Sequence, residues 1–422
     1  MNVLRPFSGR LGALVLLLSV VVSGCDVMPG SDGVDPTMPV STLPSTSDVV
    51  ETPSSDADAL TSLDSIPAPS LRATSAASPT PSPETTPSAT ATATSPATEQ
   101  PTIVPTPTHV PLPPLPISAH LDPMKHAYQT WNNCSAVSAS MVLSYFGITR
   151  SQEQLATVFR PNLNDKHVEP KQLVRFFPDY GLRADLYEGG SIEIVKRLVA
   201  SGFPVMTPQW LDFKADAIGH YRVVRGFDDE RGGFLVNDSM TGADVLISYD
   251  DFERLWRAFN YRYIPVYRPQ DRPLIEQVVG SDVDRRTNLE RALALFSDLA
   301  AKDPDNAYYR FSIGSSFFEL GNYHEAIAAY EKAAAIGLPS KMLWYQFWPV
   351  AAYNEVGNYQ RALELATEQI ASAGTFAEMR FERGRAFEAL GNQAAALVEY
   401  RQAISDDANL QAAQGAVARL GN

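Results

Sequence analysis

The sequence predicts an α+β domain followed by an all-α array of helical repeats, with a long unfolded segment in front of both. Residues 119–269 begin with segments of helical periodicity and continue with segments rich in β-branched and aromatic residues. Residues 285–422 repeat a similar phrase about every 34 residues. No Phe, Tyr or Trp occurs between Phe7 and Tyr128, so the region before the α+β domain lacks the residues of a core.

The first 25 residues have the pattern of a targeting segment. Arg5 and Arg10 are followed by an apolar run at 11–22, which is short for a membrane span and typical of a signal peptide. The run ends in "VSGC", which resembles the lipobox of bacterial lipoproteins; a plain secretory signal is the alternative. We expect residues 1–24 to be removed and Cys25 to be lipidated. The chain would then be anchored to a bacterial membrane by its lipid, outside the cytoplasm.

Residues 25–118 are predicted to form a stalk. They are rich in Pro, Thr, Ser and Ala and cannot bury enough apolar surface to offset their chain entropy, so we expect a disordered or polyproline-like segment. The whole chain has a net charge of −14 and no visible basic patch. Nucleic acid is therefore not expected as a partner, because phosphate binding needs clustered Lys and Arg.

The α+β domain is expected to place helices first and a mostly antiparallel sheet after them. Gly, Pro and capping residues bound the helical segments: Ser151 and Gln154 form a capping box, and Pro170 stands near the start of a helix. Gly and Asp turns separate the strand-like segments. The expected helices are 135–146, 151–159, 169–177 and 191–202. The expected strands are 203–210, 220–227, 232–238, 244–249 and 261–268.

The C-terminal array resembles the tetratricopeptide repeat. The phrases "LGNYHEAIAAY", "VGNYQRALELA" and "LGNQAAALVEY" place Gly321, Gly357 and Gly391 at matching positions, 36 and 34 residues apart. About three units and a partial first one are expected, and the middle unit lacks the large aromatic residue at Ala366. Aromatic residues at 344–348 are interpreted as core, with a binding surface as the alternative. Such arrays offer a concave surface, here for a substrate or a protein partner.

Cys134 is a candidate nucleophile. It directly precedes the helical run at 135–146, and a helix N-terminus lowers the pKa of a thiol. If Cys25 carries lipid, Cys134 has no partner for a disulfide within the chain. The alternative is that Cys134 is a small buried residue.

His220 is the candidate base. It opens a strand-like segment, and folding the hairpin about residue 229 places it opposite Asp238. A register shift of one residue would place Asn237 there instead. An ordinary cross-strand pair, or a turn-forming role for Asp238, is the alternative.

These segments resemble a known family. "Q…NNCSA…MVLSYFG", "GHYRVVRGFDD" and "VND" are similar to the papain-like bacteriocin-processing, double-glycine cysteine peptidases. The resemblance implies that Cys134 is the nucleophile, His220 the general base and acid, and Asp238 the group that orients the imidazole. Gln129 would stabilise the oxyanion together with the Cys134 N–H.

The chain departs from the family pattern at two points. Ser135 follows the cysteine where the family has Gly, which would alter access to the thiol. The gap between Gln129 and Cys134 is one residue shorter than expected, so that Asn132 or Asn133 is an alternative oxyanion donor.

We therefore expect a membrane-anchored, extracytoplasmic cysteine peptidase that acts on a peptide or protein substrate. The alternative is an inactive peptide-binding scaffold lipoprotein. Neither a cofactor nor a metal site is expected, because the sequence has no P-loop, no dinucleotide fingerprint and no close cluster of metal-ligating residues.

Overall fold

The structure is a computed structural model that describes residues 112–162, 165, 167–214, 216–374 and 376–421. The predicted signal peptide, Cys25 and most of the predicted stalk lie outside the described residues. Residues 112–118 were assigned to the stalk, yet Leu112 and Leu115 pack against the core of the α+β domain. Within the described ranges, no helix combines the length and the apolar character that a membrane crossing requires.

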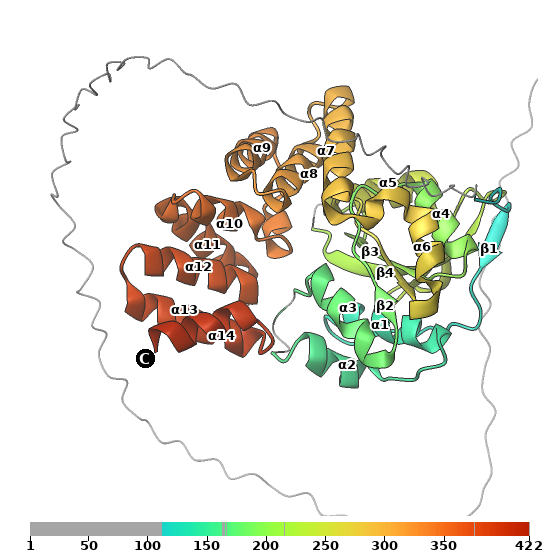
Figure 1. The fold of residues 1–422 in the computed structure, drawn as a ribbon, viewed down its shortest axis with the longest axis horizontal. Coiled ribbons are helices and arrows are strands. Elements are labelled where there is room, and N and C mark those ends of the chain that lie inside the picture. Colours follow the sequence, from blue (N-terminus) through green and yellow to red (C-terminus); the bar gives the residue numbers. More distant parts are fainter. Residues whose placement is uncertain (1–111, 163–164, 166, 215, 375, 422) are drawn as a thin grey trace, which may run out of the picture. The chain divides into compact units, whose positions relative to one another are not determined.

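An antiparallel sheet forms the centre of the α+β domain (Figure 1). Its main strand order is β2-β7-β3-β4-β5-β6, and β1 pairs with the far half of β4, beyond the end of β3. The strands are β1 (Ser118–His120), β2 (Arg183–Ala184), β3 (Val205–Trp210), β4 (Gly219–Asp228), β5 (Gly233–Asp238), β6 (Gly242–Ser248) and β7 (Ile264–Tyr267). The predicted α+β class is confirmed.

Helix α1 (Cys134–Tyr145) packs on β4 and buries eight of its twelve residues, because its apolar and small residues, four serines among them, are spread around the helix. A buried hydrogen bond from Ser138 Oγ to the Tyr221 carbonyl oxygen joins the two elements at 3.2 Å. The other helices of the domain are α2 (Gln152–Phe159), α3 (Pro170–Phe176), α4 (Ile192–Ala200), α5 (Tyr249–Trp256) and α6 (Arg272–Val279). Helix α2 begins with the predicted capping box of Ser151 and Gln154. Neither α5 nor α6 was predicted.

The register of the β4–β5 hairpin differs from the prediction. Val223 faces Asn237, and Asp228 faces Gly233, with a bulge between Val224 and Gly226. The loop is centred beyond residue 229, because the Asp228 carboxylate accepts the N–H groups of the next turn residues and holds a four-residue loop. The expectation that His220 directly faces Asp238 is therefore wrong.

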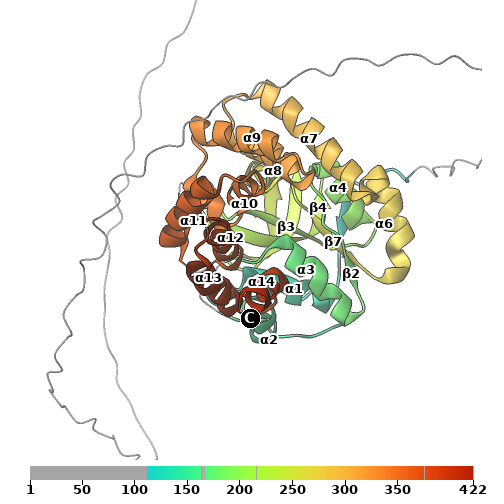
Figure 2. The same ribbon diagram turned by 60° about the vertical axis from the view of Figure 1, so that its left-hand side comes forward.

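The C-terminal region is an array of antiparallel helices, as the repeat pattern predicted (Figure 2). Helix α7 supplies the second helix of a partial first unit, and α14 closes the array. The helices are α7 (Arg285–Lys302), α8 (Ala307–Glu319), α9 (Tyr323–Ile336), α10 (Trp348–Glu355), α11 (Tyr359–Ala373), α12 (Ala377–Ala389), α13 (Gln393–Asp406) and α14 (Gln411–Leu420).

One packing position explains why the middle unit lacks its aromatic residue. In the outer units a glycine lies under a tyrosine: a Cβ atom placed at Gly314 would lie 2.6 Å from the Tyr330 ring, and one at Gly384 would lie 2.6 Å from the Tyr400 ring. In the middle unit the equivalent residues are Val350 and Ala366, which are fully buried in one cluster. The larger valine fills the space that the smaller alanine leaves.

A double-mutant cycle tests this exchange of volume. Gly384→Val is expected to lower the free energy of unfolding by about 1–3 kcal/mol, because the valine overlaps the Tyr400 ring. Adding Tyr400→Ala is expected to recover part of that loss, since the pair then matches Val350 and Ala366. The coupling is expected to be about 0.5–3 kcal/mol, measured by urea unfolding. Strictly additive losses would contradict the exchange.

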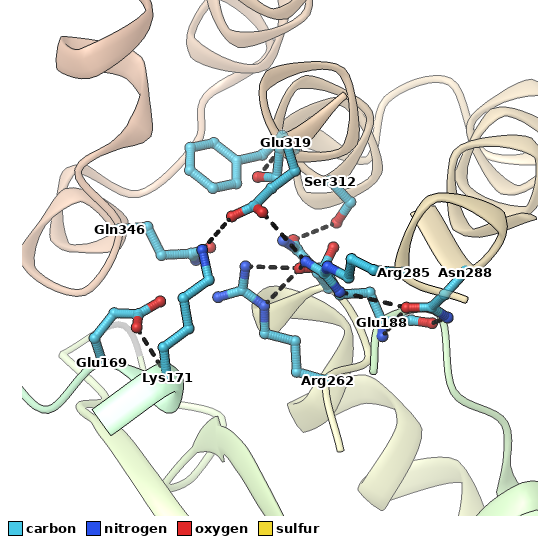
Figure 3. A network of polar contacts seen from close by, with 12 residues as sticks. Glu169, Lys171, Glu188, Arg262, Arg285, Asn288, Ser312, Glu319 and Gln346 are labelled. Atoms are coloured by element: carbon cyan, nitrogen blue, oxygen red, sulfur yellow. Dashed lines mark hydrogen bonds and ion pairs between the residues drawn. The ribbon is translucent and has the colours of Figure 1, made fainter. Parts of the chain in front are cut away.

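The first repeat units are joined to the α+β domain by a shared core and a polar network. Trp210 and Phe259 of the domain share an apolar cluster with Phe311 of the repeats. Next to this cluster, buried Glu188 accepts hydrogen bonds from Arg262 of the domain and Arg285 of the repeats (Figure 3).

The far end of the array also contacts the domain. Asn162 Nδ2 donates to Asp406 Oδ1 at 3.1 Å, and Gln172 Nε2 donates to Asp407 Oδ2 at 3.3 Å. Both ends of the array are thus fastened to the same domain.

Candidate active site

Cys134 is the first residue of α1, and its side chain is partly exposed. The preceding Asn133 is buried and holds the loop in place before the helix. Its Nδ2 donates to Thr130 Oγ1 at 2.6 Å, and its Oδ1 accepts from Arg160. The thiol therefore lies where the first N–H groups of a helix have no intrahelical partner.

His220 lies between Cys134 and Asp238. Its Nε2 is 3.1 Å from Asp238 Oδ1, and its ring lines the same pocket as the Cys134 thiol, whose pKa it lowers. Because Nε2 faces the carboxylate, Nδ1 is the nitrogen left for the thiol. The predicted contact of His220 with Asp238 is present although the predicted register is wrong, because the two side chains meet diagonally across the strands. The catalytic roles of the three residues stay predictions.

Asp238 is held by partners that the sequence analysis missed. Its Oδ2 accepts from Arg222 Nε at 2.8 Å, and its Oδ1 also accepts the backbone N–H of Met240 at 2.8 Å. Arg222 is buried and donates further to Gln209 Oε1 and to the carbonyl oxygens of Trp210 and Leu211. Arg222 lies two residues after His220, so strand alternation places both side chains on one face of β4, which was the available signal.

The electrostatics of the three residues favour a thiolate beside an imidazolium. Burial raises the pKa of the Cys134 thiol, but the hydrogen bond and positive charge of His220 outweigh it, and the pKa lies below its ordinary value. Burial lowers the pKa of His220, but its hydrogen bonds to Asp238 and Cys134 raise it above its ordinary value. Burial also opposes ionisation of Asp238, yet His220 and Arg222 hold the pKa of this carboxyl far below its usual range.

Asn132 lines the pocket around the Cys134 thiol, whereas Gln129 does not. Gln129 is tied to the residue after Asp238: its Oε1 accepts from Ser239 Oγ at 2.7 Å, and its side chain does not line the pocket around Cys134. Asn132 does line that pocket, and its buried Nδ2 has no hydrogen-bond partner among the described residues. Asn132 has a left-handed backbone with a φ of 56°, which is unusual outside glycine. An amide donor without a partner beside a nucleophile is suited to an oxyanion.

The pocket around Cys134 and His220 has about 40 Å³ of free space, enough for only a few water molecules. Ser135, the residue that replaces glycine in the family motif, is part of its wall. So is Tyr345, which comes from the repeat region.

His167 also lines this pocket. It is 5% exposed, and burial together with the charge of Arg262 lowers its pKa to about 3, so the imidazole is neutral. Its Nε2 has no hydrogen-bond partner in the described ranges. Nothing in the sequence around His167 signalled this burial, because the residues that cover it are distant in the chain.

No group of three or more His, Cys, Asp or Glu side chains in the described part of the chain is arranged to hold a metal ion.

Comparison with known proteins identifies both regions. Residues 119–264 match the model of the Peptidase_C39 like family, and residues 280–339 match that of the tetratricopeptide repeat. No curated protein matches the chain.

The solved structures similar to the chain include two peptidases and MamA. A putative C39-like peptidase from Bacillus anthracis is 18% identical, with a TM-score of 0.31, and the match covers 36% of this chain and 98% of that one. A double glycine motif protease from an AMS/PCAT transporter, solved with a leader peptide, is 22% identical, with a TM-score of 0.28 and coverage of 36% and 94%. MamA is 17% identical, with a TM-score of 0.29 and coverage of 32% and 81%. On the two family matches, the chain carries a domain of the Peptidase_C39-like family followed by tetratricopeptide repeats.

Proposed function

We propose that the protein is a cysteine peptidase that hydrolyses a peptide bond through Cys134, His220 and Asp238. The observation that supports this proposal is that His220 bonds to the Asp238 carboxylate and lines the same pocket as the Cys134 thiol. The lowered pKa of the thiol and the raised pKa of the imidazole add to it, because a nucleophilic thiol needs thiolate character at neutral pH.

In the proposed reaction the Cys134 thiolate attacks the scissile carbonyl carbon, and the imidazolium of His220 gives its proton to the leaving amine. The C–N bond breaks and a thioester to Cys134 remains. His220, now neutral, takes a proton from water as the water attacks the thioester, and the carboxylic acid product leaves with the thiolate restored. Asp238 holds the ring orientation throughout and stabilises its positive charge.

The oxyanion of each tetrahedral intermediate would be stabilised by the Cys134 N–H and the Asn132 amide. Asn132→Ala is expected to lower kcat by about 10²–10³-fold, as the loss of one such donor does. Gln129→Ala is expected to have a smaller effect, since Gln129 is bonded to Ser239 outside the pocket. Steady-state kinetics of both variants distinguish the two residues, and a larger loss in Gln129→Ala would restore the assignment made from the family motif.

We also propose that the enzyme works outside the cytoplasm on a lipid anchor at Cys25, and that the repeats recruit the substrate or a protein partner. The support for the anchor is the order of the basic, apolar and "VSGC" segments. A disordered stalk over 25–111 would place the domain roughly 50 Å from the anchor.

The proposed hydrolysis is tested by incubating the full-length protein with a peptide library. Mass spectrometry of the products and of acid-quenched protein is expected to show cleaved peptides and an acyl group on Cys134. Both signals are expected to disappear in Cys134→Ala. If peptides bind but remain intact and Cys134 carries no acyl group, the domain is a peptide-binding module instead.

A further inference from the structure

The repeat region reaches into the candidate active site through Tyr345. This residue follows the 3-10 helix η5 (Ser340–Trp344), precedes α10, and lines the same pocket as Cys134 and His220. Its ring lies against Gly219, the residue directly before His220: a Cβ atom placed at Gly219 would be 2.9 Å from the ring.

Tyr345 is held in a fixed position. Its ring packs edge-on against Trp210 and Phe259 of the α+β domain, with centroids 5.9 and 6.0 Å apart. The next residue, Gln346, is buried and donates from Nε2 to the Ala258 carbonyl oxygen at 3.3 Å. Such anchoring makes Tyr345 a rigid wall of the pocket rather than a mobile cover.

The neighbouring segment is anchored in the same way. Trp348 is 2% exposed, and the guanidinium carbon of Arg262 lies 4.2 Å from the centre of its ring. Arg262 is in turn bonded to buried Glu188 at 2.9 Å, within the network of Figure 3. The chain on both sides of Tyr345 is therefore tied to the domain.

Another wall of the pocket also depends on the repeats. His167 lines it, and the Phe376 ring, just before α12, packs on the His167 ring with centroids 4.6 Å apart. The repeats thus contact the pocket directly at Tyr345 and support a second wall at His167.

We propose that Tyr345 is a specificity-determining residue of the peptidase site, which limits the size of the substrate side chain beside His220. This inference rests on the proposed function. With Phe259 and Pro208, the Tyr345 ring forms a rigid apolar wall around little free space. Substrates with a small side chain at this subsite fit, whereas branched and aromatic side chains collide with the ring. The repeats are accordingly part of the substrate-binding site.

The test uses the full-length protein and three peptidyl chloromethyl ketones that differ only in the residue beside the ketone: Ala, Leu or Phe. The Cys134 sulfur displaces chloride and forms a C–S bond, so adduct formation can be timed by mass spectrometry without a known substrate. In wild type the Ala probe is expected to react fastest. In Tyr345→Ala the ratio of Leu to Ala rates is expected to rise about tenfold or more, as when a pocket gains room for added methylene groups.

Matched variants distinguish the effect of the Tyr345 ring from the effects of its hydroxyl group and of truncation in the repeats. Tyr345→Phe keeps the ring and is expected to keep the wild-type ratio, whereas Tyr345→Trp is expected to slow even the Ala probe. Tyr323→Ala makes the same truncation at a repeat position outside the pocket and is expected to change nothing. If Tyr345→Ala does not fold by circular dichroism, Tyr345→Trp and Tyr345→Phe still test the wall.

Two results would overturn the inference. An unchanged ratio in Tyr345→Ala, with no slowing in Tyr345→Trp, would show that the ring does not select side chains. If the reaction rates of all three probes and of iodoacetamide rise equally in Tyr345→Ala, then Tyr345 limits access to the thiol without selecting among substrate side chains. Failure of the proposed function gives a different result. The wild-type protein would then form no acyl group on Cys134 and would leave every library peptide intact, independently of the ratio of the probe rates.

Discussion

Replacing His220 by alanine is expected to abolish peptide hydrolysis and to raise the pKa of the Cys134 thiol. In the proposed mechanism the imidazole supplies the proton for the leaving amine, and its positive charge offsets the burial of the thiolate. Without it burial dominates, and the thiol pKa is expected to rise to or above the ordinary value of about 8.5. Loss of a triad member lowers kcat by ~10⁴-fold or more.

The thiol pKa is measured by timing alkylation of Cys134 with iodoacetamide between about pH 5 and 10. In wild type the alkylation rate is expected to rise with pH through a midpoint below that of an ordinary cysteine thiol, because the pKa of Cys134 is lowered in the folded protein. In His220→Ala this midpoint is expected to move to higher pH. His324→Ala, on the exposed part of α9, serves as the control and is expected to keep the wild-type profile. Identical profiles in wild type and His220→Ala would show that the imidazole does not act on the thiol.

Replacing Arg222 by methionine is expected to cause a large loss of stability. Arg222 is 3% exposed and donates to Asp238, to Gln209 and to two backbone carbonyl oxygens. Methionine fills part of the volume but leaves the Asp238 carboxylate with only half of its charge partners. Breaking a buried pair in this way costs ~3–5 kcal/mol, which urea unfolding followed by circular dichroism would measure.

The pH dependence of this loss is a second readout. The pKa of Asp238 is held down in the folded protein, so its stabilising contribution is present above the unfolded pKa of about 4 and is lost as the pH falls through the folded value. The difference between wild type and Arg222→Met is therefore expected to shrink as the pH is lowered below about 4. Arg254→Met is the matched control: its ion pair with Asp251 is more than 40% exposed on both sides and should contribute little. Equal losses in the two variants would contradict the assigned role of Arg222.

The elements that the sequence predicted are those defined by local chemistry. The capping box at Ser151, Pro170 at the start of α3 and the 34-residue repeat each depend on neighbouring residues, and all three are found in the structure. The pairing of His220 with Asp238 was predicted for a partly wrong reason. The bulge and the loop after Asp228 shift the register, and the length of the two side chains restores the contact.

The residues that the sequence could not identify depend on distant parts of the chain. His167 and Tyr345 have no motif around them. Tyr345 reaches the pocket because the repeats dock on the α+β domain, and Phe376 of the repeats packs on the His167 ring. Contacts between residues more than 100 positions apart in the chain are the information that local patterns lack.

The pair of Val350 and Ala366 explains why the repeat unit that departs from the pattern still packs.

Attachment of the array at both ends has a consequence for its evolution. A solenoid that is free at one end can gain or lose a unit without disturbing the rest of the protein. Here one more or one fewer pair of helices would carry Asp406 and Asp407 away from Asn162 and Gln172. The length of the array is therefore constrained by the domain that it closes upon, and relatives with this closure are expected to share its number of units even where their sequences have diverged.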